Sequence, residues 1–360
     1  MTTRIVIIVF MLLDFAHQQQ TLQDPTVKSL PLLRCLPLLP LLVAVNGAMA
    51  AQNDTAVPQV GPVEHVDGLN KVFGQHPGAR AIHAKGIVLE GSFTPAPSAA
   101  SVSKAAHFQH TSVPVTVRFS NFAGIPDIPD NHPLANPRGL AIKFKLPDGT
   151  ITDIVAHSFN GFPAPDADEF HNLIVALGAS GPGAAKPTAL DTYLNSHPVA
   201  KNFLTQQKTA PVSYATLPYY GVNTFKFTDA GGKVSYGRYQ FLPVSGEHLL
   251  KAADAEKATP DYLSSEIRQR IKQAPAQFKL QLQIAEPGDK LDDPSIAWPD
   301  SRRTVELGTL SISNVVENSS GAEKALLFQP NVLTPGIEVQ DPMVNVRSAA
   351  YAVSFGRRQQ

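Results

Sequence analysis

Cysteine is almost absent from this sequence. The 360 residues contain a single one, Cys35, which lies in the apolar N-terminal region. If that region is removed, as argued below, the mature chain has no thiol. It then carries no disulfide, no thiolate-bound zinc, no iron–sulfur cluster and no cysteine nucleophile. Packing alone must stabilise the fold, and a chain of about 310 residues can bury a core large enough for that.

The sequence also lacks an excess of charge of either sign. Its 30 basic and 30 acidic residues give a formal net charge of zero. A protein whose main partner is nucleic acid needs a basic surface to neutralise phosphates, so the balance argues against that class. The chain has 31 prolines. Because proline interrupts helices, many loops and strand edges are expected.

Long hydrophobic runs are missing as well. The apolar runs near the N-terminus, residues 5–13 and 37–45, are shorter than the roughly 20 residues that cross a bilayer as a helix. No stable membrane span is therefore expected. The second run follows basic residues and ends in Ala48-Met49-Ala50, which is typical of a secretory signal with its cleavage site.

This pattern predicts that residues 1–50 are a targeting segment removed after Ala50. The first apolar run is then either an extension of the signal or a misassigned start. Residues 51–360 are expected to form a single domain, because no convincing boundary divides them. The mature protein is expected to be periplasmic or secreted.

Short segments of alternating apolar and polar residues recur along the chain. In residues 140–146 every second side chain is apolar, and a Pro-Asp-Gly turn joins this segment to the next strand as a hairpin. Repeated short strands with turns between them predict an α+β protein with an antiparallel core, either a closed barrel or a sandwich. Strands are expected at residues 87–93, 113–119, 140–146, 151–155, 223–227, 234–241, 278–285 and 305–312, and helices at 168–177, 264–274 and 342–355.

Arg347 and Tyr351 are four residues apart in the last predicted helix. They therefore share a face, and the arginine lies beside the phenol. A neighbouring cation favours the phenolate, which is an electron-rich iron ligand and the haem ligand of catalases. From the spacing alone, a stacked or solvated surface pair is by far the more common case.

Three residues around the first two strands are further candidates. His83, just before the first strand, is either structural or a proton shuttle, since histidine titrates near neutrality. Ser120, which ends the second strand, can hydrogen-bond and orient a ring nitrogen. Arg118 is either a surface charge or a partner for the carboxylate of a ligand.

Several blocks, in one order, resemble the catalase superfamily, and in particular its short branch of catalase-related haem peroxidases. The similarity covers most of the mature chain, so it is far more specific than any single motif. The blocks are residues 80–86, 117–120 with Gly124, 137–144, 153–155, 221–226, 305–310 and 328–351. The resemblance implies a closed antiparallel β-barrel with surrounding helices and a haem cofactor, with haem b expected.

The resemblance also implies roles on the two sides of the haem. Tyr351 would be the proximal iron ligand, Arg347 would hold it as phenolate, and Asp341 would orient Arg347. On the distal side His83 would be the acid–base group, with its ring fixed by Ser120.

The periphery of the haem is assigned in the same way. The resemblance implies that Arg80, Arg118 and Arg347 lie near the propionates. Phe170 and Phe162 would pack against the porphyrin. Aromatic walls and arginines suit haem, because it is a flat apolar disc with two carboxylates.

The sequence departs from the family pattern in three places. Catalases usually follow the third block with a distal asparagine. Here His157 and Ser158 occupy that position, with Asn160 as an alternative, and His157 is either catalytic or a loop histidine. Asn223 stands where catalases usually have histidine before Thr-Phe. The chain also stops soon after Tyr351, so the C-terminal helical domain of long catalases, with its reduced-nicotinamide site, is not implied.

The combined expectation is a haem peroxidase that reduces hydrogen peroxide or organic hydroperoxides with small organic donors. Its catalase activity is expected to be weak or absent, because the usual distal asparagine is missing. Two alternatives stay open: an enzyme of the same fold that converts fatty-acid hydroperoxides, and a secreted β-barrel that binds an apolar ligand without chemistry. Assembly into a homo-oligomer is possible on either view.

Overall fold

A computed structural model describes residues 60–109 and 111–360. The predicted targeting segment, residues 1–50 with Cys35, lies outside the described residues, as does the start of the predicted domain up to residue 59. Among the described helices, none combines the length and the apolar character that crossing a membrane would need.

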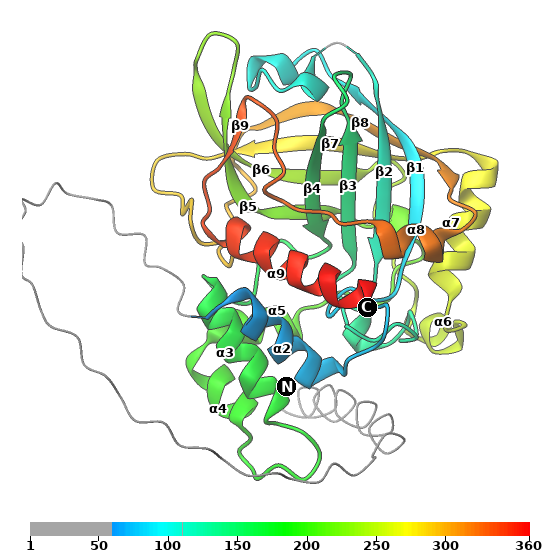
Figure 1. Ribbon diagram of the computed structural model, residues 1–360, viewed down its shortest axis with the longest axis vertical. Helices are drawn as coiled ribbons and strands as arrows, with labels where there is room; N and C mark the ends of the chain where they lie inside the picture. Colours follow the sequence, from blue (N-terminus) through cyan, green and yellow to red (C-terminus); the bar gives the residue numbers. More distant parts are fainter. Residues whose placement is uncertain (1–59, 110) are drawn as a thin grey trace, which may run out of the picture.

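The core is a closed antiparallel β-barrel (Figure 1). Its strands follow the order β4-β3-β2-β1-β8-β7-β6-β5, and pairing of His157 with Tyr220 joins β4 to β5 and closes the barrel. The barrel strands are β1 (Gly86–Pro95), β2 (Val113–Ser120), β3 (Gly139–Lys145), β4 (Ile151–His157), β5 (Tyr219–Thr228), β6 (Val234–Pro243), β7 (Ala276–Ile284) and β8 (Thr304–Val315). The prediction of a catalase-like closed barrel with surrounding helices is confirmed.

All eight predicted strands are present, and the alternation, β-branched and aromatic residues and turns that predicted them are typical of strands in a half-buried or buried sheet. In β3 the alternating residues Leu140, Ile142 and Phe144 are fully buried. The sequence did not predict β9 (Ile337–Val339), which pairs with β5. Three residues are too few to show a periodic pattern.

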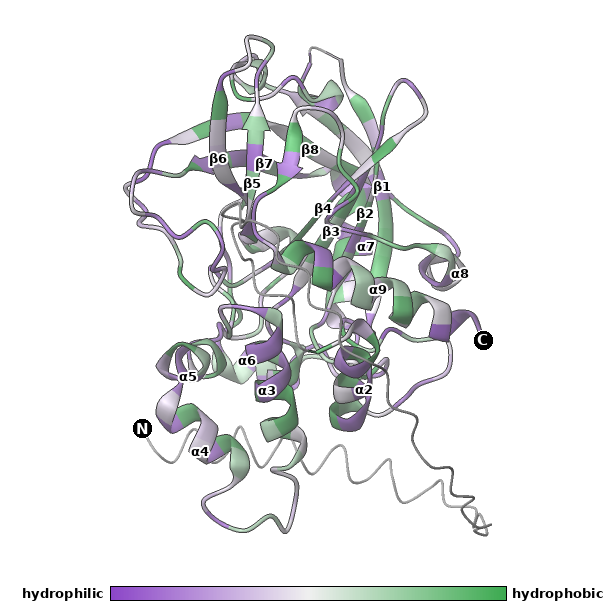
Figure 2. Ribbon diagram, turned by 60° about the vertical axis from the view of Figure 1, so that its left-hand side comes forward, coloured by the Kyte–Doolittle hydropathy of each residue, from purple (hydrophilic) through white to green (hydrophobic). Residues whose placement is uncertain are grey.

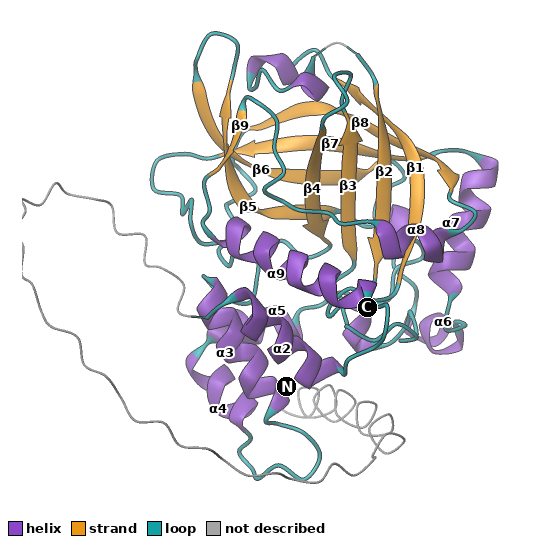
Figure 3. Ribbon diagram, viewed as in Figure 1, coloured by secondary structure: helices purple, strands orange, loops and turns teal. Residues whose placement is uncertain are grey.

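The helices gather outside the barrel (Figure 3). They are α2 (Pro62–Phe73), α3 (Ala167–Gly178), α4 (Ala189–Ser196), α5 (Pro198–Thr205), α6 (Ala252–Lys257), α7 (Tyr262–Gln273), α8 (Ser319–Ala325) and α9 (Met343–Gln359), with short 3-10 turns at Ala99–Ser101, Ala106–Phe108, Pro133–Ala135 and Tyr214–Thr216. The three predicted helices correspond to α3, α7 and α9. The sequence did not predict the others. Four of these five helices, α4, α5, α6 and α8, have only six to eight residues, which is too short for a clear helical period.

Helix α9 lies between the open end of the barrel and the group formed by α2 and α3 (Figures 1 and 2). It runs from Met343 to Gln359, directly after Pro342. Proline has no backbone N–H to donate, so it is tolerated at the start of a helix but not in its interior. The barrel interior is filled by apolar and aromatic side chains such as Phe119 and Tyr214, whose rings stack with centroids 5.2 Å apart. Because these side chains fill the interior, we expect a ligand site to lie outside the barrel core.

Candidate functional site

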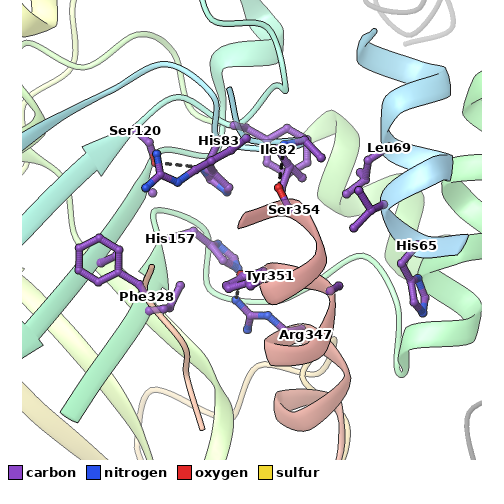
Figure 4. A pocket seen from close by; sticks show the side chains of 18 of the residues that line it. His65, Leu69, Ile82, His83, Ser120, His157, Phe328, Arg347, Tyr351 and Ser354 are labelled. Atoms are coloured by element: carbon purple, nitrogen blue, oxygen red, sulfur yellow. Dashed lines mark hydrogen bonds between the residues drawn. The ribbon is translucent and has the colours of Figure 1, made fainter. Parts of the chain in front are cut away.

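A large cavity lies where the barrel end faces α2, α3 and α9 (Figure 4). It encloses about 1340 Å³, part of it open to solvent. All nine residues that the sequence predicts for the site line this cavity, although they are spread over most of the chain: Arg80, His83, Arg118, Ser120, His157, Phe162, Phe170, Arg347 and Tyr351. In Figure 4, His83 with Ser120 stands apart from Arg347 with Tyr351.

His83 is held in an unusual backbone conformation. Its φ is +56°, and it is the single non-glycine residue with positive φ in the described part of the chain. Such a conformation costs free energy and persists only where the surroundings enforce it. Here the His83 N–H donates to the Phe122 carbonyl oxygen at 2.7 Å, and ring Nδ1 lies 3.0 Å from Ser120 Oγ. Because Ser120 holds Nδ1, the other ring nitrogen is left for the cavity.

The surroundings keep the His83 ring neutral. Burial lowers the pKa of His83 well below its usual range, and the positive charge of Arg118 lowers it further. At neutral pH the ring is therefore unprotonated and able to accept a proton.

Three neighbouring strands place Ser120, Gly139 and His157 in one row at the barrel end. Ser120 pairs with Gly139 across β2 and β3, and Gly139 pairs with His157 across β3 and β4. A Cβ atom on Gly139 would lie 2.4 Å from Ser120 Oγ and 2.8 Å from His83 Nδ1. Only glycine leaves room for the pair formed by His83 and Ser120.

His157 presents a hydrogen-bond donor to the cavity. Its Nδ1 accepts the backbone N–H of Phe159 at 3.4 Å. In a neutral imidazole the accepting nitrogen carries no proton, so Nε2 carries it. Burial lowers the pKa of His157 to about 3, which keeps the ring neutral. Nε2 is buried and has no hydrogen-bond partner within the described residues.

The alternatives to His157 are not placed in the site. Ser158 Oγ accepts the backbone N–H of Arg138 at 2.9 Å, so its hydroxyl supports the backbone beside the barrel row. Neither Ser158 nor Asn160 lines the cavity, whereas His157 does. Of the three residues that the sequence left open, His157 is the one that lines the cavity.

Arg347 and Tyr351 form the expected pair on α9, since Arg347 Nη2 donates to the Tyr351 hydroxyl at 2.9 Å. Arg347 Nη1 donates to Asn223 Oδ1, and Asn223 Nδ2 donates to Asp341 Oδ2 at 2.6 Å. Asp341 therefore reaches Arg347 through Asn223 rather than by a direct hydrogen bond. Asn223, which β5 places between them, connects the buried carboxylate to the guanidinium group.

A group of arginines lies at another part of the cavity. Arg80 Nη1 and Arg118 Nη2 lie 3.0 and 2.9 Å from Glu323 Oε2 of α8. Arg358 of α9 also lines the cavity here and donates to the carbonyl oxygen of Leu326, as Arg80 does. We call Arg80, Arg118, Arg358 and Glu323 the arginine cluster.

The resemblance implies that Arg80, Arg118 and Arg347 lie near the haem propionates, and this stays a prediction. In the structure the third arginine beside Arg80 and Arg118 is not Arg347, which pairs with Tyr351 and Asn223. Arg358 is 11 residues further along α9, about 16 Å away along the axis, and takes that place. The signal was present, because Arg358 follows Tyr351 by seven residues and so lies on the same helical face.

Aromatic side chains form one wall of the cavity. The Phe162 and Phe170 rings pack with centroids 5.0 Å apart, and Phe203 lies 6.5 Å from Phe162. Phe203 and Phe328 also line the cavity, and the sequence analysis did not single out either of them as a wall residue. The site is thus an apolar slot with a cationic cluster, a phenol paired with arginine, and two neutral imidazoles.

The family model described as Catalase matches residues 63–358. The chain belongs to the catalase family. A "Catalase-related peroxidase" of Mycolicibacterium paratuberculosis is 35% identical over 301 residues, which cover 82% of this chain and 94% of that protein. One from Synechococcus elongatus is 30% identical, with 84% and 90% covered. The solved structure of a fungal catalase matches with a TM-score of 0.69 at 22% identity, covering 87% of this chain and 66% of that one, which bears on the fold alone.

Membership of the catalase family confirms the prediction of a haem-dependent peroxidase, an oxidoreductase of the catalase superfamily. The cavity fits the haem that proteins of this family bind. Phe162, Phe170 and Phe203 give it an aromatic wall suited to a flat apolar ring. In the arginine cluster, the Nε atoms of Arg118 and Arg358 are buried without a hydrogen-bond partner among the described residues, as expected of a site built for carboxylates.

Proposed function

We propose that this catalase-family protein is a haem b peroxidase that reduces hydrogen peroxide with small organic electron donors and evolves little oxygen. One observation carries the proposal. His83 with Ser120, and Tyr351 with Arg347, line the same cavity although 268 positions separate the histidine from the tyrosine in the numbering. These are the acid–base group and the ligand that haem peroxide chemistry requires.

The proximal residues and the arginine cluster would hold the cofactor. When bound, haem supplies the redox chemistry of the reaction. Tyr351 would ligate its iron, and Arg347, beside the hydroxyl, stabilises negative charge on that oxygen. Arg80, Arg118 and Arg358 would bind its carboxylates through charge-assisted hydrogen bonds.

His83 moves the proton. The ring is neutral, so Nε2 accepts a proton from hydrogen peroxide and returns it to the leaving oxygen, which departs as water. Ser120 keeps the ring in place through Nδ1 at 3.0 Å. A correctly positioned acid–base group contributes typically about 10²- to 10⁴-fold to the rate.

His157 would donate its Nε2–H to the bound peroxide. An imidazole in this tautomer offers a single donor, whereas an amide offers two donors and an acceptor. The arrangement supports a weaker hold on a second peroxide molecule, whose two-electron oxidation needs exact orientation. We therefore propose that organic donors, rather than a second peroxide, complete most turnovers.

We also propose that the protein acts outside the cytoplasm, after removal of residues 1–50. The support is the basic flank, apolar run and Ala48-Met49-Ala50 site of the sequence. Sequencing the N-terminus of the protein exported by its host is the test. A mature chain that begins before residue 30 would contradict this part of the proposal.

Absorption spectra of the purified holoprotein test the main proposal. We expect a Soret band that changes on adding peroxide and is restored by an organic donor. Tyr351→Phe should change the absorption spectrum of the haem, because the iron loses its tyrosine ligand, and should abolish activity. His83→Ala should retain haem, but its rate of reaction with peroxide should fall by about 10²-fold or more. Tyr193→Phe, on α4 with its hydroxyl bonded to Glu169, is the matched control and should behave as the wild type. Full activity of Tyr351→Phe would refute the ligand assignment.

A further inference from the structure

The arginine cluster is organised by the end of α8. Arg80 donates to the Glu323 carboxylate and to the carbonyl oxygens of Glu323 and Leu326, at 3.0 to 3.1 Å. Arg118 donates to the same carboxylate at 2.9 Å, and Arg358 donates to the Leu326 carbonyl oxygen. Three cationic side chains from a loop, a strand and a helix thus converge on one short segment.

Glu323 lies behind the arginines as seen from the cavity. Arg80, Arg118 and Arg358 line the cavity, whereas Glu323 does not. Its Oε2 accepts both ion-pair contacts, and Oε1 is buried without a hydrogen-bond partner in the part of the chain described here. A carboxylate arriving from the cavity would therefore meet the exposed edges of the arginines without displacing Glu323.

The charges of the cluster do not balance. Three guanidinium groups and one carboxylate leave a net charge of plus two in a buried place. Burial lowers the pKa of Arg80 well below its ordinary value, and the like charges of Arg118 and Arg358 lower it further. Burial, followed by the charge of Arg118, lowers the pKa of Arg358 to about 10. Burial first, and the neighbouring cations second, thus disfavour the charged guanidinium groups, and we expect a bound anion to stabilise them.

We propose that Glu323 sets the charge of the arginine cluster, and so makes the site selective for a cofactor that carries two free carboxylates on one edge. The inference rests on the proposed haem function. It adds that a residue outside the cavity decides which porphyrins are accepted, because Glu323 neutralises one of the three cations and leaves two for the ligand. Glu323 is a positioning residue, since it acts through Arg80 and Arg118.

The role of Glu323 is tested by comparing the binding of two porphyrins to the wild type and to one variant. The dissociation constants of ferric protoporphyrin IX and of its dimethyl ester are measured by Soret titration with apoprotein, under one detergent condition, for the wild type and Glu323→Gln. We expect the wild type to prefer the diacid. Glu323→Gln raises the cluster charge to plus three, so the preference should increase by about tenfold or more, because charges at such separations interact strongly away from water. The melting temperature should fall more for the apoprotein than for the diacid complex.

Matched variants separate charge from shape. Glu323→Asp keeps the charge and should keep the wild-type preference. Glu306→Gln, which removes a carboxylate from an exposed ion pair with Lys279, should leave both constants unchanged. Arg80→Gln alone lowers the cluster charge to plus one, so the preference for the diacid should decrease. The double variant Arg80→Gln with Glu323→Gln carries plus two again, so its preference should return to the wild-type level. This pair still tests the proposal if Glu323→Gln alone does not fold.

The outcomes distinguish the two proposals. If the wild type binds neither porphyrin, the proposed function itself fails. If the wild type binds protoporphyrin but the preference for the diacid is the same in Glu323→Gln, or the double variant stays at the level of Arg80→Gln, the role of Glu323 is refuted.

Discussion

At the scale of single residues, His157 shows how one backbone hydrogen bond decides what a side chain can do. The Phe159 N–H occupies Nδ1, so the only proton of the neutral ring is on Nε2. The sequence placed His157, Ser158 and Asn160 near the distal position but could not choose among them. The choice depends on the direction in which the chain leaves β4, which no local pattern encodes.

If His157 donates a hydrogen bond through Nε2, two substitutions at residue 157 should change the enzyme's activities in opposite directions. His157→Asn restores an amide with two donors, so oxygen evolution from hydrogen peroxide should increase relative to oxidation of an organic dye, by several-fold or more. His157→Phe removes the donor from a buried site and should slow the first reaction with peroxide by about 10-fold, as expected for loss of a hydrogen bond worth about 1–1.5 kcal/mol.

Oxygen release and dye oxidation by the same preparations provide the measurement. Haem content by Soret absorbance is the control that separates lost chemistry from lost cofactor. If His157→Phe kept the wild-type rate, or His157→Asn left the ratio of the two activities unchanged, the donor role of His157 would be wrong.

At the scale of elements, α9 combines the proximal residues and part of the arginine cluster on one helical face. Met343, Arg347, Tyr351, Ser354 and Arg358 follow at intervals of three or four residues, and all line the cavity. The helical period therefore places these side chains on one face of α9. Which of them meets a partner depends on other segments, such as β5, which supplies Asn223 to Arg347, and the residue after α8, Leu326, whose carbonyl oxygen accepts from Arg358.

Strand β3 supports the distal side through the absence of a side chain. Gly139→Ala would place a methyl group 2.4 Å from Ser120 Oγ and 2.8 Å from His83 Nδ1. Relieving this overlap must move the His83 ring or the strand, which we expect to cost about 1–3 kcal/mol of stability. The reaction with peroxide should slow by 10-fold or more, because the acid–base group is displaced.

Stopped-flow spectra with peroxide and thermal melts measure the two effects. Gly181→Ala is the matched control, since a Cβ there meets no atom within 4 Å and both quantities should stay close to the wild type. Unchanged kinetics in Gly139→Ala would show that the row of Ser120, Gly139 and His157 does not position His83.

At the scale of the whole molecule, three buried histidines couple folding to pH. Burial lowers the pKa of His83, and lowers the pKa of both His107 and His157 to about 3. His107 lies inside the barrel against Phe93 and Phe144, and both its nitrogens lack a hydrogen-bond partner among the described residues. In the unfolded chain each histidine titrates near 6.5.

Acid is therefore expected to destabilise the fold. As pH falls below about 6.5, these histidines become protonated in the unfolded chain but stay neutral in the native protein, so the free energy of unfolding decreases. His107 and His157 each contribute up to about 1.4 kcal/mol per pH unit between about 6.5 and 3, and His83 contributes in the same direction. We expect denaturant melts of the apoprotein to show a steep loss of stability below pH 6.5.

His107→Leu isolates one of the three contributions. The variant should lose stability with acid less steeply than the wild type, by up to about 1.4 kcal/mol per pH unit, while its stability at pH 7.5 reports the packing change alone. Identical slopes for the variant and the wild type between pH 6.5 and 5 would contradict the assignment of His107 as a buried neutral group.

The sequence by itself determined the periodic features of this protein. Alternation with a period of two fixed the eight barrel strands, and intervals of three and four fixed the common face of Arg347 and Tyr351, because both depend on local backbone geometry. Only the tertiary structure decided the partners: Asn223 between Asp341 and Arg347, Arg358 in place of Arg347 in the arginine cluster, and Glu323 behind it. Such contacts form between segments that are far apart in the sequence, and a local sequence pattern does not show which of these segments will pack together.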